Sequence, residues 1–156
     1  MKNPFQKAMF WSLIVCILSV GFLLSLAACD ESQIRKAATA SDRMATLIAV
    51  GIDVKRDLRT AALIDADEDR AISQGLLSAN KAVQRFNERA RTYQTLTPTA
   101  RSELTKLFAD VTGALKTLND DGIFRIRNPD AQKKLAAVLA SLNEAAGFIS
   151  QVLNYG

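Results

Sequence analysis

The amino-acid sequence predicts an all-α fold, an antiparallel up-down four-helix bundle preceded by an N-terminal apolar helix. Three observations support this fold class. After residue 31, four segments carry apolar residues at spacings of three and four, which is the repeat of one helix face. Short joints of proline, glycine or acidic residues separate the segments, and short joints favour antiparallel neighbours. No run of alternating polar and apolar residues is long enough for a sheet.

The first element is the apolar run of residues 8–28, which follows a short basic segment containing Lys2 and Lys7. The run holds no ionisable side chain except Cys16, so it can enter a bilayer without the cost of burying a charge. Basic residues ahead of such a run stay on the cytoplasmic side. We therefore expect an apolar signal helix that directs export of the remaining chain.

The apolar run ends at Leu26-Ala27-Ala28-Cys29. This motif resembles the lipobox of bacterial lipoprotein precursors. The resemblance implies that a diacylglycerol is attached to the thiol of Cys29, that cleavage occurs between Ala28 and Cys29, and that the new amino terminus is acylated. Cys16 is discarded as an acylation site, because Val15 precedes it and too little apolar sequence lies before it.

Three parts of the chain follow from the motif: a lipoprotein signal peptide at 1–28, a lipidated N-terminus at 29–31 and a helical bundle domain at 32–156. The alternative is an uncleaved signal anchor, since about 20 apolar residues also span a bilayer as a helix. We favour cleavage, because the cysteine stands at the very end of the apolar run and the polar region starts directly after it.

Asp30 directly follows the predicted lipidation site. An aspartate there resembles the signal that keeps enterobacterial lipoproteins in the inner membrane, a rule that does not hold in all bacteria. The alternative is an ordinary acid near a helix start, where it interacts favourably with the helix dipole. We expect a location in the bacterial cell envelope, lipid-anchored and facing the exported side, with the inner membrane favoured if the aspartate rule applies.

The first two bundle helices are expected at 32–64 and 67–96. In the acidic joint between them, Asp65 or Asp67 can accept hydrogen bonds from the free amides of the second helix. The stripe of the first helix is Met44, Leu47, Ile48, Gly51, Val54, Leu58, Ala61 and Ala62. The second helix has the most regular heptad, formed by Ile72, Leu76, Ala79, Val83, Phe86, Ala90 and Tyr93.

The third and fourth helices each start with a capping residue followed by proline, at Thr97-Pro98 and Asn128-Pro129. We expect the third helix to end between 119 and 122, with Gly122 in the left-handed conformation. Its stripe is Leu104, Leu107, Phe108, Val111, Leu115 and Leu118. The stripe of the fourth helix is Leu135, Val138, Leu139, Leu142, Ala145, Ala146, Ile149, Val152 and Leu153.

The joint at 122–128 is the one connection that is not plainly polar. We expect Ile123, Phe124 and Ile126 to fold back and close the end of the bundle, while Arg125 and Arg127 point outward. The functional alternative is an exposed apolar and basic tip that contacts a partner or a membrane surface.

Composition limits the possible functions. Only two of the 20 basic residues precede Cys29 and all 16 acidic residues follow it, so the exported part carries a net charge near +2. These charges are interspersed rather than clustered, so we expect no nucleic-acid partner. The chain has no histidine, the usual general base and the commonest transition-metal ligand. No cysteine follows Cys29, so packing without disulfides must stabilise the fold.

The sequence offers two possible sites, a calcium-binding loop and a serine-lysine pair, and supports neither strongly. The sequence Asp65-Ala66-Asp67-Glu68-Asp69 opens like a calcium-binding EF-hand loop, but Arg70 and Leu76 occupy the positions that require glycine and glutamate. An acidic helix start is the better interpretation. A serine-lysine nucleophile remains open, although no motif marks one. We therefore expect neither a metal site nor a cofactor.

Four glycines, Gly51, Gly75, Gly113 and Gly147, fall inside predicted helices, where each costs about 1 kcal/mol relative to alanine. Close helix crossing explains that cost best, and the alanines at 61, 62, 145 and 146 suit close packing as well. The alternative is a cavity that admits a small apolar ligand.

Two hypotheses for function follow. The first is a membrane-anchored envelope lipoprotein whose bundle acts as a structural or protein-interaction module, with membrane lipid as one partner through Cys29 and a protein or a second copy as another. The second is a bundle that binds a small apolar ligand. An enzyme is not expected.

Overall fold

The computed structural model describes residues 33–155. It contains four α-helices, α2 (Gln33–Thr60), α3 (Ala66–Arg91), α4 (Pro98–Thr117) and α5 (Pro129–Tyr155). A π-helical turn, Leu118–Gly122, extends α4, and a 3₁₀ turn, Ile123–Arg125, leads toward α5. No strand occurs between residues 33 and 155, and the prediction of an all-α fold is confirmed.

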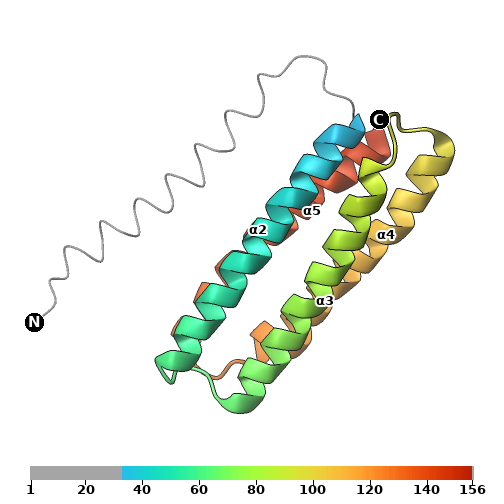
Figure 1. The fold of residues 1–156 in the computed structure, drawn as a ribbon. Coiled ribbons are helices and arrows are strands. Elements are labelled where there is room, and N and C mark those ends of the chain that lie inside the picture. The colour runs from blue at the N-terminus through green and yellow to red at the C-terminus, as the bar shows by residue number, and fades with distance from the viewer. Residues whose placement is uncertain (1–32, 156) are drawn as a thin grey trace, which may run out of the picture. The chain divides into compact units, whose positions relative to one another are not determined.

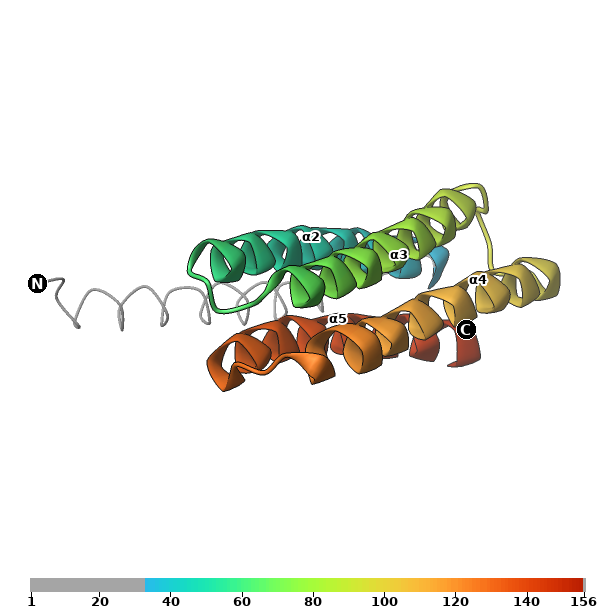
Figure 2. The ribbon, with the colours of Figure 1, turned by 90° about the horizontal axis from the view of Figure 1, so that it is seen from below.

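The chain reverses direction at each joint, so that α2 and α4 begin at one end of the helical unit and α3 and α5 at the other (Figure 1). Helix α2 packs against both α3 and α5, and α3 packs against α4 and against the π-helical turn. The view in Figure 2 separates α2 and α3 from α4 and α5 as two layers.

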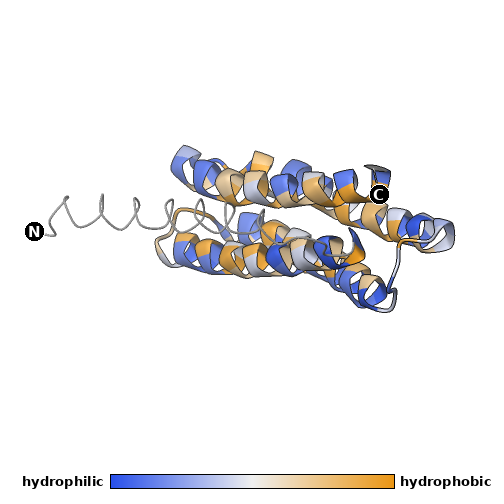
Figure 3. Ribbon diagram, turned by 90° about the horizontal axis from the view of Figure 1, so that it is seen from above, coloured by the Kyte–Doolittle hydropathy of each residue, from blue (hydrophilic) through white to orange (hydrophobic). Residues whose placement is uncertain are grey.

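Each helix buries one apolar face between these layers. Hydrophobic and hydrophilic residues alternate along every helix in Figure 3, as expected for helices that bury one side. The predicted stripes of α3, α4 and α5 are confirmed within the helices, with Leu107, Phe108 and Val138 only partly buried. The predicted end of the second helix at 96 was wrong, because α3 ends at Arg91, and Tyr93 lies in the turn beyond it, partly buried. In α2 the core begins earlier than predicted, because the small residues of its first turns let it pack closely; the additional buried residues are Ile34, Ala37, Ala38, Ala40 and Ser41.

The predicted start signals of the helices are confirmed. Asp65 caps α3 in a capping box with Glu68, and Thr97 caps α4 through the amide of Ala100. The side chain of Asn128 accepts hydrogen bonds from the amides of Asp130 and Ala131 at the start of α5.

The predicted helix ends were less accurate. Helix α2 stops at Thr60, because Ala62 has a φ of 54° and the amide of Leu63 donates back to the carbonyl of Leu58. Ala61 and Ala62 are therefore exposed, not part of the stripe. Gly122 has a φ of −101°, so it is not a left-handed terminator; it is buried, and a Cβ there would lie 3.5 Å from Ile72 and from Leu118, which is ordinary contact.

Close crossing explains only two of the four helical glycines. A Cβ on Gly75 would lie 2.8 Å from Cδ1 and 3.0 Å from Cα of Leu118, so this position needs glycine. A Cβ on Gly51 would lie 3.1 Å from Cδ2 of Leu76, a tight contact that this side chain relieves by moving a few tenths of an ångström. A Cβ on Gly113 or Gly147 would have no neighbour within 4 Å. The prediction was wrong for these two because periodicity does not show which side of a helix has a neighbour.

Candidate functional site

The predicted lipidation and cleavage residues, Ala28 and Cys29, and the conditional sorting residue Asp30 lie outside the described residues, as does the whole signal segment 1–28. Their roles stay predictions. The structure describes the helical unit that follows this segment. On its surface, three clusters of polar side chains connect different helices or loops.

The first cluster is a serine-lysine pair. Lys55 on α2 donates to the hydroxyl of Ser73 on α3 at 2.9 Å, and its ammonium lies 3.0 Å from the carboxylate of Asp69. The hydroxyl of Ser73 donates in turn to the carbonyl of Asp69 at 2.7 Å. A nucleophilic serine needs a neutral amine that accepts the hydroxyl proton. Here the Lys55 amine is the donor and the Ser73 hydroxyl donates to a carbonyl, so the cluster links α2 to α3.

The second cluster joins the two loops at the end where α3 and α5 begin. Arg127 donates from its guanidinium to Asp65 at 2.6 Å and from its backbone amide to Glu68 at 2.9 Å. Both acids also serve the capping box of α3. The backbone amide of Glu68 holds the pKa of Asp65 below its usual value, and the amide of Asp67 and the guanidinium of Arg127 lower this pKa further.

The acids of the former calcium-loop candidate therefore have other partners. Asp65 binds Arg127, Asp67 pairs with Arg70 at 2.9 Å, and Asp69 pairs with Lys55. Within residues 33–155, no group of three acidic or cysteine side chains is arranged to hold a metal ion. The acidic joint caps a helix and connects two loops.

Because the pKa of Asp65 is lowered in the folded state, we expect part of the stability of the fold to be lost at acidic pH. A group whose pKa is lower in the folded state stabilises the fold above its unfolded pKa, near 3.8, and loses that effect as the pH falls through the folded value. Asparagine at this position keeps the cap but has no charge to titrate. Thermal melts between neutral and strongly acidic pH should show a smaller loss of Tm in Asp65→Asn than in the parent. Equal losses would contradict this role.

The end-closing joint agrees with the prediction for two of three residues. Ile123 and Ile126 are buried, and Arg125 and Arg127 lie on the surface. Phe124 is 75% exposed, so its predicted burial was wrong. A 3₁₀ turn cannot point three neighbouring apolar side chains the same way, and the two isoleucines already fill the space at the end of the bundle.

The third cluster connects α3 to α4 at the opposite end. Glu103 accepts hydrogen bonds from Arg89 at 2.7 Å and from the hydroxyl of Tyr93 at 2.6 Å, while the guanidinium of Arg89 lies 5.1 Å from the centre of the Tyr93 ring. The Tyr93 hydroxyl, followed by Arg89, lowers the pKa of Glu103. The same hydrogen bond raises the pKa of Tyr93, because the neutral phenol is the donor.

An open groove of about 540 Å³ lies beside this cluster; its walls are Arg85, Glu88, Arg89, Thr92, Glu103, Lys106 and Leu107. The groove is wide open and charged side chains surround it, so it does not enclose the small apolar ligand considered above. The sequence prediction missed both cluster and groove. The signal was present as charges at helical spacing, Arg85 and Arg89 on one helix and Glu103 and Lys106 on the other.

Among the described helices, the segment Pro129–Asn154 of α5 is long and apolar enough to cross a membrane by length and composition. Most of its large apolar side chains are buried in the helical unit, mainly against α2, whereas Phe148 is exposed. Core packing therefore accounts for most of its apolar composition. Comparison of the whole chain with protein-family models, curated proteins and solved structures finds no match.

Proposed function

We propose that this chain is an envelope lipoprotein in which acylated Cys29 anchors an antiparallel up-down four-helix bundle to the outer face of a bacterial membrane. The observation that carries the proposal is the lipobox-like motif at the end of the apolar run, directly ahead of the first bundle helix. Residues 32–156, which follow the predicted lipidated N-terminus in the sequence, form a compact unit.

The bundle is proposed to act as a structural or protein-interaction module rather than as an enzyme or an apolar-ligand carrier. Its apolar side chains form one core. Within each polar cluster described above, basic and acidic side chains from different parts of the bundle form ion pairs. An uncleaved signal anchor with the same exported bundle is the second reading of the N-terminal segment. Asp30 favours the inner membrane where the aspartate rule applies.

The substitution Cys29→Ala is expected to abolish acylation and to leave the precursor uncleaved, because no other cysteine stands in a lipobox-like sequence. Mass spectrometry of the membrane form should give a chain that starts at an acylated Cys29 in the parent and at Met1 in the variant. Cys16→Ala is the matched control and should be processed like the parent. A parent chain that starts at Met1 with an unmodified Cys29 would favour the signal anchor.

Phe124 is the side chain most available for a protein partner. It is the most exposed large apolar residue between 33 and 155, and its loop is held from both sides. Arg127 connects the loop to α3, and the side chain of Gln132 donates to the carbonyls of Ile123 and Phe124 at 3.4 and 3.3 Å. An aromatic side chain on a rigid loop is a typical anchor residue of an interface.

We expect Phe124→Ser to remove a discrete crosslinked product from native membranes while leaving the Tm unchanged. Leu77→Ser is the control, because Leu77 is also exposed, at 53%, but lies on the surface of α3. Mass spectrometry of the product distinguishes a different protein from a second copy. A product that persists in Phe124→Ser would place the contact elsewhere.

A further inference from the structure

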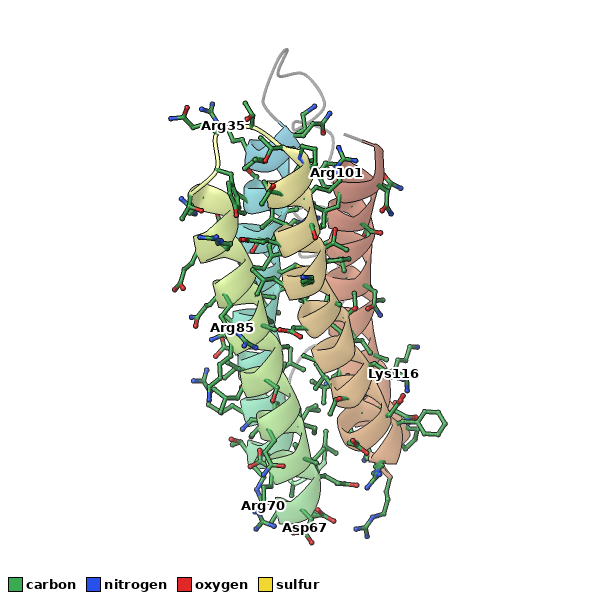
Figure 4. All side chains as sticks on the ribbon, turned by 90° about the vertical axis from the view of Figure 1, so that its right-hand side faces the viewer. Arg35, Asp67, Arg70, Arg85, Arg101 and Lys116 are labelled. Carbon is green, nitrogen blue, oxygen red and sulfur yellow. The ribbon has the colours of Figure 1, made fainter. Side chains whose placement is uncertain are left out.

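The two ends of the bundle differ in charge. Figure 4 shows Arg35 and Arg101 at one end and Asp67 and Arg70 at the other. The smaller part near the start of α2, residues 33–43, 84–110 and 146–155, carries eight Lys and Arg against four Asp and Glu. The larger remainder, 44–83 and 111–145, carries ten of each. The positive excess therefore lies in the smaller part, which we call the basic end; Asp30 and Glu31, next in sequence, reduce the excess without removing it.

Most of the acidic residues at the basic end form ion pairs with basic residues of the bundle. Arg91 pairs with Asp42 and Arg89 with Glu103, each at 2.6 Å, and Arg85 lies 3.8 Å from Asp110. Three other cations at this end, Lys36, Arg101 and Lys106, form no ion pair with any described residue. Lys106 is exposed and also interacts electrostatically with Glu103, while Lys36 and Arg101 are half-buried, so an external anion can reach part of this charge.

The helix starts reinforce this difference. The two helices that begin at the basic end, α2 and α4, have no acidic residue in their first turns. Those that begin at the opposite end do, with Asp67, Glu68 and Asp69 in α3 and Asp130 in α5. Each helix start carries about half a positive charge, which an acid in the first turn offsets. Among the described residues of the basic end that offset is missing, and Lys36 and Arg101 lie close to the helix starts. Asp30 and Glu31, directly ahead of α2 in the sequence, would offset part of the charge at its start.

We propose that the basic end binds the anionic lipid headgroups of the membrane that holds the chain. This inference rests on the proposed function, because the acyl anchor would keep the basic end at the bilayer. Only three residues separate Cys29 from Gln33, and an extended chain spans at most about 3.6 Å per residue. Cations that close to an anionic leaflet are attracted within about 8–10 Å of its surface, and salt weakens the attraction.

The test uses the full chain, purified from membranes and reconstituted into vesicles of phosphatidylcholine alone or with phosphatidylglycerol. A fluorophore is attached at the basic end in Thr99→Cys or at the opposite end in Thr60→Cys, both exposed positions, in a Cys16→Ala background. A quencher on the lipid headgroups reports proximity. We expect anionic lipid to raise quenching at position 99 about fivefold or more at low salt, to lose this increase at high salt, and to leave position 60 unchanged.

Two triple variants decide whether the proposed cations are responsible. Lys36→Gln/Arg101→Gln/Lys106→Gln should abolish the increase, whereas Lys81→Gln/Lys133→Gln/Lys134→Gln, which removes equal charge from exposed positions elsewhere, should retain it. Equal quenching in both lipids, an equal response at positions 99 and 60, or loss in the control triple variant would overturn the proposal. The acyl anchor is tested separately, by flotation with phosphatidylcholine vesicles and by the mass of the purified chain. A chain that lacks the anchor would contradict the proposed function, whereas an anchored chain without the lipid-dependent quenching would contradict only the binding of headgroups.

Discussion

Replacement of Phe86 by alanine is expected to lower the free energy of unfolding by about 3–5 kcal/mol, the largest single loss that we anticipate. The Phe86 side chain is fully buried, and its ring meets that of Phe108 edge to face, with 6.1 Å between the ring centres. Truncation removes apolar burial, this ring contact and the packing of α3 against α4, and it leaves a cavity. Denaturant unfolding monitored by circular dichroism measures the loss.

The matched control for this prediction is Phe124→Ala, which removes the same atoms from a side chain that is 75% exposed. Its effect on unfolding should stay within about 0.5 kcal/mol. Leu115→Ala, in the buried stripe of α4, should cost about 2–5 kcal/mol. A loss below about 1 kcal/mol at Phe86 would mean that α3 and α4 do not pack as described.

Alanine at two helical glycines is expected to change stability in opposite directions. At Gly75 a Cβ would lie 2.8 Å from Cδ1 and 3.0 Å from Cα of Leu118, so backbone must move, and the cost should be about 1–3 kcal/mol. At Gly113 no atom lies within 4 Å, so alanine should add up to about 1 kcal/mol of helix propensity. Thermal and denaturant unfolding of both variants measure the difference. A loss at Gly113 would indicate a neighbour that packs on this face of α4.

The sequence predicted helix starts better than helix ends. The caps at Asp65, Thr97 and Asn128 act over two or three residues, so local sequence is enough to predict them. The end of α2 depends on Ala62, a residue without a sequence signal for the left-handed conformation. Such an end follows from the packing of Leu63 and Ile64 behind it, which periodicity does not reveal.

The candidate sites also fall into those that the sequence predicts and those that only the fold reveals. Cys29 and its neighbours are identified from their order along the chain alone, and no fold is needed to interpret a processing motif. The polar clusters require neighbours in space: Lys55 and Ser73 are 18 positions apart, Arg89 and Glu103 are 14, and Arg127 and Asp65 are 62. Which of these charges meet depends on the pairing and rotation of whole helices.

By itself, the sequence determined the all-α class, the helix starts, the apolar stripes and the position of the lipobox-like motif, because each depends on the spacing of residues along the chain. Only the tertiary structure decided that Gly75 needs its missing side chain while Gly113 does not, that Phe124 lies outside while Ile123 and Ile126 lie inside, and that the excess of basic over acidic residues lies at the end where α2 begins. These properties depend on which surfaces face each other, and packing sets that relation through contacts between distant residues.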